Sequence, residues 1–407
     1  MSRGDSRYPR PSEMLDLDVS LPSDEGELAR YGELALHSLG LPASRLPLFL
    51  GRLDPSTVRV ARQGTEVVGG LVTLPMGHWF GGRAVPCAGI TAVGVAAEHR
   101  SRGIASELLR TVLEEARRDG VALSSLFPAT FPVYRAAGYE SAGNRVLYRV
   151  ALSTVGGGAR EPEVRRATPD DHPTMRALYD ERSRGMSGAV DRTAYFWRRV
   201  FEPPSGDETV PYIVSGASGP EGYVVLSQRS TSVPLEPIDI AVVDVVARTP
   251  AAGRRIVRML SDHRSIASHA RWASGPGDPL LLLLREERLE VTTLQRWMLR
   301  IVDLRAALEK RGWPATATGE VHLDVRDPIL RENARRWVLE VDRGRATVRD
   351  GGSGGIAMDV RGLAALYSGF LSAEELRVAG LCDGDDAELA RASALFAGPA
   401  PWTSDFF

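Results

Sequence analysis

The sequence predicts an α/β (α+β) protein of three domains, and three observations support this fold class. The chain has 407 residues, more than one hydrophobic core ordinarily serves, so two or three domains are expected. Runs of β-branched residues alternate with segments of helical spacing along most of the chain. A strand-to-helix pattern at residues 93–103 has a weak counterpart at 243–253. We therefore expect domains at residues 1–153, 154–302 and 303–407.

The first domain is expected to begin with a helix and to continue as strands. Residues 2–12 are polar and predict a disordered leader, and residues 25–39 have helical spacing. Residues 102–119 predict an amphipathic helix, because apolar residues recur on one side of it. The remaining elements are strands, expected at residues 57–61, 66–75, 86–96, 124–127 and 147–152.

The second and third domains follow a glycine-rich linker at residues 155–162. The second domain alternates strand and helix patterns from residue 164 to about 302. Its most apolar run, Leu280 to Leu284, is too short to cross a bilayer and predicts a buried strand. The third domain predicts strands first and helices later, with strands at 321–325, 336–341 and 346–349 and helices at 360–369, 373–379 and 387–396.

Composition and charge exclude several classes of protein. A net charge of −2 gives no reason to expect nucleic acid or an anionic membrane as a partner. Cys87 and Cys382 are the only cysteines, and we expect two buried thiols in a reducing compartment. The histidines lack zinc-helix spacing and no Gly-x-Ser-x-Gly elbow occurs, so neither a metal site nor a hydrolase is predicted. The N-terminus has no apolar signal segment, so we expect a cytoplasmic protein.

A strand, a polar turn and the start of a helix meet at residues 90–106, and this segment carries the main chemical signal. A helix begins with unpaired N–H groups and the positive end of its dipole, which together attract an anion. Gly103 lacks a Cβ and so lets a pyrophosphate approach the backbone, while Ala105 keeps the next turn small. Arg100 and Arg102 add positive charge. Residues 100–106 are called the anion loop below.

The anion loop resembles the coenzyme A pyrophosphate loop of GNAT acetyltransferases, whose signature is Arg/Gln-x-x-Gly-x-Gly/Ala. Arg100, Gly103 and Ala105 match it position by position, with the preceding strand and following helix that the motif requires. Ser101 stands where the stricter pattern has a second arginine.

The counterpart at residues 243–253 lacks this chemistry. Pro250 and Arg255 occupy the positions that Arg100 and Ala105 hold in the first copy. The pattern therefore indicates either a duplicated fold that has lost its function or a coincidence between two strand-to-helix turns.

A second motif lies at residues 131–140, where Tyr134 precedes Gly138-Tyr139 by four residues. It resembles the GNAT pattern in which this tyrosine protonates the departing CoA thiolate. Amine attack on a thioester expels a thiolate, so a phenol within reach is a suitable general acid. The alternative for Tyr134 is a core aromatic residue whose hydroxyl is satisfied locally.

Over nearly its whole length the chain resembles the enhanced intracellular survival (Eis) family of GNAT N-acetyltransferases. Residues 296–303 (RWMLRIVD) and the ending 402–407 (WTSDFF) add to the two motifs. The resemblance implies an active GNAT domain, a degenerate second GNAT domain and a sterol-carrier-like C-terminal domain, assembled as a homohexamer. It also implies acetyl-CoA as co-substrate, with contacts at Val93, Gly94, Val95, Arg100, Ser101, Arg102, Gly103, Ile104, Ala105, Ser106, Ala129 and Thr130.

The C-terminus predicts a docked tail, because flexible tails seldom expose aromatic residues such as Trp402, Phe406 and Phe407. In the Eis family the terminal carboxylate enters the active site of the first domain and takes a proton from the amine. The resemblance implies this role for the carboxylate of Phe407. An α-carboxylate is ionised at neutral pH and is a weak base unless it is partly desolvated. A tail packed only against its own domain is the alternative.

Three functions remain open at this point. The first is acetylation of a primary amine on a small polycationic acceptor, similar to an aminoglycoside or a polyamine. The second is acetylation of protein lysines by the same chemistry, and the third is non-enzymatic carriage of an apolar ligand by the C-terminal domain. The sequence favours catalysis, because a binding protein needs neither Tyr134 nor a docked ending.

Overall fold

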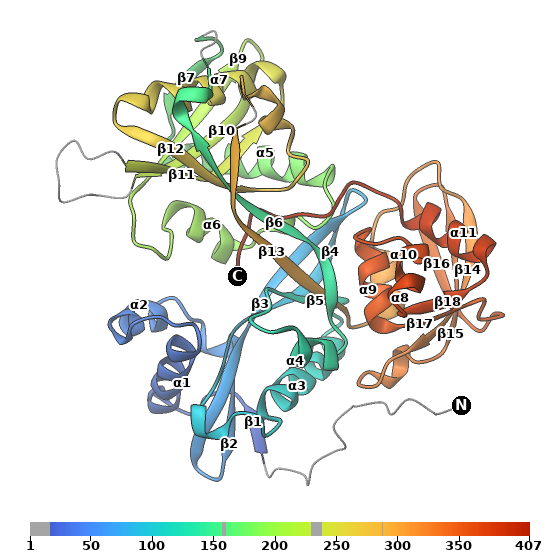
Figure 1. The fold of residues 1–407 in the computed structure, drawn as a ribbon. Coiled ribbons are helices and arrows are strands. Elements are labelled where there is room, and N and C mark those ends of the chain that lie inside the picture. The colour runs from blue at the N-terminus through green and yellow to red at the C-terminus, as the bar shows by residue number, and fades with distance from the viewer. Residues whose placement is uncertain (1–16, 157–159, 229–237, 287) are drawn as a thin grey trace.

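The computed structural model describes residues 17–156, 160–228, 238–286 and 288–407. Its strands form one sheet of 13 strands and a separate sheet of five. Figure 1 shows three lobes, with long strands crossing the centre of the molecule between the first two. The leader expected at residues 2–12 and part of the expected linker, residues 157–159, lie outside the described residues.

The first lobe has helices on both faces of its strands. Alternate residues of these strands pack in one apolar cluster with α1 (Glu25–Ser38) and in another with α3 (Ile104–Arg118). The apolar side predicted for α3 is buried throughout, because it forms one face of an amphipathic helix. Two short helices, α2 (Leu46–Leu50) and α4 (Phe131–Ala136), complete the lobe. Its strands are β1 (Leu17–Ser20), β2 (Val58–Gln63), β3 (Glu66–Phe80), β4 (Arg83–Val95), β5 (Leu123–Leu126) and β6 (Glu140–Ala151).

The second lobe repeats the order of strands and helices and shares the sheet of the first. Its strand β12 pairs antiparallel with β6 and so joins the two halves of the sheet, and β8 pairs with β3. Its helices are α5 (His172–Arg184), α6 (Ala194–Phe201) and α7 (Pro250–Asp262). Its strands are β7 (Glu163–Arg166), β8 (Val190–Asp191), β9 (Thr209–Gly216), β10 (Gly219–Gln228), β11 (Ile238–Ala247) and β12 (Ala267–Ser274).

The strand β13 (Leu289–Ile301) follows the second lobe in sequence but lies in the first lobe's half of the sheet. It is hydrogen-bonded between β5 and β6, antiparallel to both. Its second half supplies four fully buried apolar side chains: Trp297, Met298, Leu299 and Ile301. The core of the first lobe is therefore completed by residues far along the chain.

The third lobe is a five-stranded sheet with helices, which contains the three strands predicted from the sequence and two more. The strands run in the order β16-β15-β14-β17-β18. Glu140 joins this lobe to the first, because its buried carboxylate binds Arg361 at 2.5 Å and Arg135 at 2.9 Å. The elements are α8 (Leu304–Lys310), β14 (Gly319–Arg326), β15 (Arg336–Asp342), β16 (Arg345–Asp350), β17 (Ile356–Asp359), α9 (Val360–Ser368), α10 (Ala373–Val378), β18 (Cys382–Gly384) and α11 (Asp386–Phe396).

One predicted strand is wrong: the apolar run from Leu280 to Leu284 begins as a 3₁₀ helix, Pro279–Leu283. Asp278 caps this helix by accepting a hydrogen bond from the Leu280 N–H, and proline suits the first helical position. As a result Leu281 is buried while Leu282 is 78% exposed. Both cysteines are free and buried, as expected. None of the helices in the described ranges is long and apolar enough to cross a membrane.

Candidate active site

The strands β4 and β5 run parallel and then separate, which leaves an open strand edge. Their pairing extends from Cys87 opposite Leu123 to Ile90 opposite Leu126. Beyond Ile90, β4 continues to Val95 while remaining paired with β3 on its other side. Among the described strands, nothing pairs with the free edge of β4 at residues 93–95. Backbone N–H and C=O groups are therefore available there for an extended ligand.

A β-bulge at Ala92 changes the course of β4 just before this open edge. Ala92 has a φ of 51°, which is unusual for a residue with a side chain, and the β3–β4 register shifts between Gly70 and Val72. Tyr31 of α1 donates a hydrogen bond from its buried hydroxyl to the Ala92 carbonyl at 2.8 Å. A Cβ on Gly94 would lie 3.0 Å from the Leu34 carbonyl oxygen. The helix α1 thus holds the bulge from one face of the sheet.

The anion loop lies between β4 and α3 and faces open space. Gly103 is the N-cap of α3 with a φ of 86°, and a Cβ there would meet no atom within 4 Å. The first N–H groups of α3 have no acceptor within the helix, as at any helix start. The side chains at 100, 101, 102 and 106 are exposed, that of Ala105 is half-buried, and that of Ile104 points into the core. The loop can therefore offer backbone N–H groups and positive charge to a phosphate.

Two further observations concern Arg100 of the anion loop and the turn that follows β5. The Nε of Arg100 lies 3.4 Å from the Val95 carbonyl oxygen, so this side chain folds back along β4. Ala129 and Thr130 are exposed in the turn after β5, and Thr130 is the N-cap of α4. These residues border the same separation of β4 from β5.

Tyr134 lies on α4 with its ring buried, only 7% exposed. It belongs to the same apolar cluster as Ile90 and Leu126, the last paired residues of β4 and β5. In the described part of the chain its hydroxyl has no hydrogen-bond partner. Burial raises the pKa of Tyr134, so the phenol is protonated at neutral pH. The proton of this hydroxyl is therefore not held by another group in the described part of the chain.

A buried arginine on β13 fixes the end of α4. Arg300 donates from its Nε to the carbonyl of Ala137 at 2.9 Å, and its Nη2 binds Asp327 at 2.7 Å with both side chains fully buried. From the sequence alone, residues 296–303 are only a family marker, and no contact of Arg300 can be assigned. Its role could be found only once β13 was placed beside β5.

Phe407 lies at the same separation of β4 from β5 and is 5% exposed. Its ring packs against Phe127 just after β5 (5.5 Å between centroids), Phe196 of α6 (5.8 Å) and His78 of β3 (6.4 Å). A Cβ on Gly89 would lie 3.3 Å from this ring, so the glycine provides the seat. Figure 1 shows the C-terminus between α6 and the long central strands.

The tail that leads to Phe407 is tied to both of the first two lobes. The Trp402 N–H donates to the Ser187 carbonyl at 3.0 Å, and the Thr403 N–H donates to the Asn144 carbonyl at 3.2 Å. Phe406 is 43% exposed and packs on Phe127 with a centroid distance of 4.7 Å. Gly89 and Ile90 point to opposite faces of β4, so Phe407 and Tyr134 approach the end of the β4–β5 pairing from opposite faces.

A buried histidine, which no sequence pattern distinguishes from the others, supports this seat. The Nδ1 of His78 lies 2.9 Å from the Gly188 carbonyl, which only accepts, so Nδ1 carries the proton. The Nε2 then accepts from the Ser125 hydroxyl at 2.8 Å. Burial lowers the pKa of His78 to about 4, so the ring is neutral. It also stacks on Trp297 at 5.1 Å.

In the second lobe the corresponding helix start is closed. Thr249 caps α7 by accepting from the Ala252 N–H, and Pro250 has no N–H to offer. The Thr249 hydroxyl donates to Glu221 at 2.6 Å, which places a negative charge at this helix start. A Cβ on Gly253 would lie 2.6 Å from the Leu283 side chain, so this glycine serves packing rather than ligand approach. This helix start does not suit an anion.

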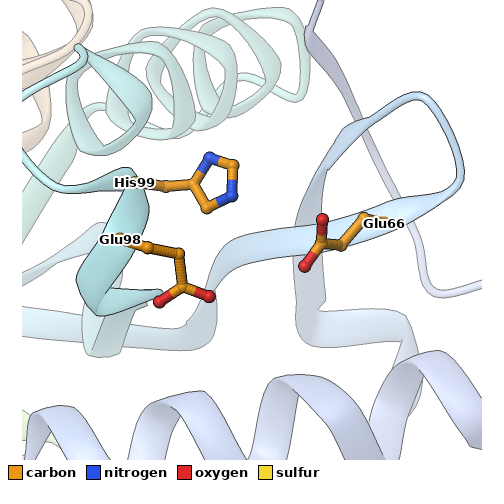
Figure 2. A group of neighbouring side chains, drawn as sticks. All are labelled: Glu66, Glu98 and His99. Atoms are coloured by element: carbon orange, nitrogen blue, oxygen red, sulfur yellow. The ribbon is translucent and has the colours of Figure 1, made fainter.

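One group in the described residues has atoms suited to a metal ion, although the sequence predicts no metal. Glu66, Glu98 and His99 each offer a ligand atom, and these atoms lie within 4.8 Å of one another. Figure 2 shows Glu66 on the hairpin facing Glu98 and His99 on the turn before the anion loop. Both carboxylates are exposed, as such groups often are without an ion, and we assign them no role in the reaction.

A surface pocket in the third lobe bears on the alternative of an apolar-ligand carrier. Its lining includes the charged residues Asp324, Arg326 and Asp383 together with Ala357, Gly380 and Cys382. Apolar ligands favour pockets lined mainly by hydrophobic side chains, so this pocket does not favour a carrier function.

Comparison with known proteins identifies three domain models along the chain. Acetyltransferase (GNAT) domain models match residues 35–142 and 188–301, and a sterol carrier protein domain model matches residues 304–404. The fold class expected from the sequence, two tandem GNAT domains followed by a sterol-carrier-like domain, is confirmed.

Individual relatives and solved structures agree with these models. The chain is 31% identical to an N-acetyltransferase of Streptomyces avermitilis, over 81% of this chain and 83% of the relative. It is 30% identical to N-acetyltransferase Eis of Mycobacterium tuberculosis, over 85% of this chain and 87% of the relative. The crystal structure of a GCN5-related N-acetyltransferase from Anabaena variabilis matches with a TM-score of 0.91 and 29% identity, over 96% of this chain and 100% of that one.

Proposed function

Because the chain belongs to the Eis family of GNAT N-acetyltransferases, we propose that it transfers acetyl from acetyl-CoA to a primary amine of a small polycationic acceptor. An aminoglycoside-like or polyamine-like molecule is the expected class. The observation that carries the proposal is the buried Phe407 at the point where β4 and β5 separate, opposite Tyr134.

The residues of the first lobe suit acetyl-CoA. The free edge of β4 at Val93, Gly94 and Val95 suits an extended pantetheine, and the anion loop suits a pyrophosphate. The exposed turn at Ala129 and Thr130 borders the same space. When bound there, acetyl-CoA would supply an acetyl group activated as a thioester.

Two groups of the chain would move the protons. The terminal carboxylate of Phe407 would take a proton from the ammonium of the acceptor, which frees the nitrogen lone pair for attack. The hydroxyl of Tyr134 would give its proton to the departing thiolate, and the second proton that the nitrogen loses as the amide forms would restore the phenol. Burial keeps that hydroxyl protonated at neutral pH, and a positioned acid contributes on the order of 10²–10⁴-fold to the rate.

A thiol-release assay with acetyl-CoA and a panel of amines tests the acceptor class. The panel contains an aminoglycoside, a linear polyamine, a lysine peptide and a sample without amine. We expect release with the small polycations well above the lysine peptide and the blank. Preferential release with the peptide would favour protein lysine acetylation, and no release with any amine would contradict the proposal.

The role of the carboxylate is tested by a chain with a C-terminal carboxamide, made by ligation of a synthetic tail. The amide keeps the shape of Phe407 and removes the charge, so acetyl transfer should collapse while acetyl-CoA binding and thermal stability stay near normal. Adding a few glycines should do the same, because it moves the charge by ~3.3–3.6 Å per extended residue. An amidated enzyme that works as well as the native one would show that the tail serves packing alone.

The assembly is proposed from the family resemblance. We propose a homohexamer in the cytoplasm, with domains bounded in sequence at residues 1–153, 154–302 and 303–407, and with β13 of the second segment completing the sheet of the first. Light scattering coupled to size-exclusion chromatography measures the mass directly, and a mass equal to one chain would contradict the hexamer.

A further inference from the structure

A buried arginine in the second lobe binds two carboxylates that come from different parts of the chain. The Nη1 of Arg192 lies 2.5 Å from Asp244 on β11, and its Nε lies 3.0 Å from Asp405 in the C-terminal tail. The three side chains are 2%, 1% and 9% exposed, respectively. These residues, Arg192, Asp244 and Asp405, are called the tail clamp.

Aromatic residues enclose the tail clamp and complete its hydrogen bonds. The guanidinium of Arg192 stacks on Tyr179 of α5 at 3.8 Å and lies 5.0 Å from the Trp197 ring. The hydroxyl of Tyr179 donates to the Val190 carbonyl at 2.8 Å and lies 3.2 Å from Asp405, and that of Tyr223 donates to Asp244 at 2.6 Å. A buried charge is stable only when it is paired and hydrogen-bonded in this way.

The guanidinium of Arg192 stays protonated in these surroundings. Burial by itself would lower the pKa of Arg192, but Asp244 and Asp405 raise it well above its usual value. Two carboxylates against one arginine leave one negative charge that a second cation must balance. Arg182 supplies a cation at the same strand, where its guanidinium donates to the Val245 carbonyl at 2.7 Å. The guanidinium of Arg192 is therefore charged where it meets Asp405.

The position of Asp244 connects the tail clamp to the lost cofactor site. In the repeat at residues 243–253, Asp244 corresponds to Gly94 of the first copy, where β4 packs closely on α1. The second lobe has an acidic side chain there, which faces α5 and holds Arg192. The strand that borders the cofactor site in one copy thus carries an anchor in the other.

We propose that Arg192 is a positioning residue for the reaction, and that the second GNAT-like domain holds the C-terminal tail through Asp405 so that Phe407 reaches the first domain's active site. This inference rests on the proposed function, in which the carboxylate of Phe407 takes part in catalysis. Asp405 is two residues from that carboxylate, a reach of roughly 7 Å at ~3.3–3.6 Å per residue. Arg145 and Arg199 also hold the tail, through hydrogen bonds to the Ser404 and Phe406 carbonyls at 2.9 Å, and Arg145 lies 5.5 Å from the Phe406 ring. These hydrogen bonds do not involve the Asp405 side chain.

The test uses Asp405→Asn in the full chain, because this change leaves the Arg192–Asp244 pair intact. Carboxypeptidase digestion followed by intact-mass measurement reports on the tail without reference to activity. We expect Asp405→Asn to lose its terminal residues at least tenfold faster than the native chain. We also expect kcat to fall on the order of 10–100-fold, because displacing a catalytic group has an effect of this size. The KM for acetyl-CoA should stay within about twofold of the native value, because the residues proposed to bind acetyl-CoA lie elsewhere. Asp405→Glu, which keeps the charge, should recover part of the resistance to digestion and part of kcat.

Two control chains set the limits of both measurements. Asp386→Asn breaks an exposed ion pair with Arg377 in the third lobe and should change neither readout. A chain that ends at Ser404 defines the complete loss of the tail. Native digestion kinetics and native kcat in Asp405→Asn would overturn the inference.

The outcomes also separate this inference from the proposed function. If the carboxamide chain is fully active while Asp405→Asn frees the tail, the clamp stands as an anchor and the catalytic role of the carboxylate is wrong. If the carboxamide chain is inactive while Asp405→Asn keeps its tail and its kcat, the proposed function stands and the clamp is wrong.

Discussion

At the scale of single residues, Tyr134 and Tyr139 have adjacent rings, 6.3 Å apart, but different surroundings. The hydroxyl of Tyr139 is hydrogen-bonded to Ser124 at 2.7 Å in a fully buried site. That of Tyr134 has no partner among the residues that the structure describes. Only Tyr134 can therefore give up its proton without breaking an existing contact.

We expect Tyr134→Phe to lower kcat on the order of 10²–10⁴-fold, because the phenol is the positioned acid for the thiolate. Acetyl-CoA affinity and the melting temperature should hardly change, since the ring remains. Tyr139→Phe is the matched control and should cost about 1 kcal/mol of stability through the lost hydrogen bond, with kcat preserved. A Tyr134→Phe enzyme within about twofold of native kcat would assign the proton to another donor.

His78 predicts a pH dependence of stability. Its folded pKa of about 4 lies below the unfolded value of 6.5 because the ring is buried. The unfolded chain therefore gains a proton first as the pH falls, so stability is complete above pH 6.5 and is lost as the pH falls toward 4. The loss from this group is about 3 kcal/mol. Urea unfolding at several pH values should show a flatter profile for His78→Gln between these limits, and an unchanged slope would contradict the buried neutral ring.

At the scale of elements, the strand–loop–helix unit of β4, the anion loop and α3 occurs twice with opposite outcomes. In the first copy the helix start is open, and Gly103 faces free space. In the second copy Thr249, Pro250 and the nearby Glu221 close the helix start. The same local pattern therefore suits an anion only where its first N–H groups stay free.

Two glycines at opposite ends of α3 allow a matched test of the anion loop. Gly103 and Gly120 have φ values of 86° and 72°, and a Cβ on either meets no atom within 4 Å. Gly103→Glu and Gly120→Glu should thus carry similar backbone strain, about 1–2 kcal/mol each. Only the first adds negative charge beside a pyrophosphate, so we expect a rise in KM for acetyl-CoA of tenfold or more in Gly103→Glu alone. Equal acetyl-CoA affinities by calorimetry would show that the loop is misassigned.

At the scale of the whole molecule, the active site depends on all three lobes. The second lobe supplies Phe196 to the seat of Phe407, the third contributes Asp327 to the buried pair that holds α4, and the tail crosses between the lobes. The strand β13 is the clearest case, because it lies between two strands of the first lobe.

The position of β13 predicts that residues 1–153 alone do not form a stable GNAT domain. Without β13, β5 and β6 lose their shared partner, and the buried side chains of Trp297 and Leu299 are missing from the core. Loss of a large buried side chain costs about 2–5 kcal/mol, and several are lost together. Circular dichroism during heating should show no cooperative transition for 1–153, whereas the full chain melts cooperatively. A native-like transition in the fragment would contradict this prediction.

The sequence by itself determined the elements and motifs whose signals are local. The amphipathic α3 and the strand, turn and helix at residues 90–106 depend on residues within one or two turns of one another, so periodicity was enough to predict them. The roles of the anion loop and of Tyr134 rest on motif resemblance and stay predictions. The same local reasoning failed at residues 280–284, where the cap at Asp278 and the proline after it outweighed apolar character.

Only the tertiary structure decided what surrounds those motifs. His78 with Ser125, Arg300 with Ala137, and Arg192 with Asp405 are separated by 47, 163 and 213 residues along the chain. Such pairs leave no periodic trace, because a buried histidine or arginine has the same sequence appearance as an exposed one. The aromatic ending indicated that the tail is docked, but its seat on Gly89 arises from the packing of three lobes around one strand separation.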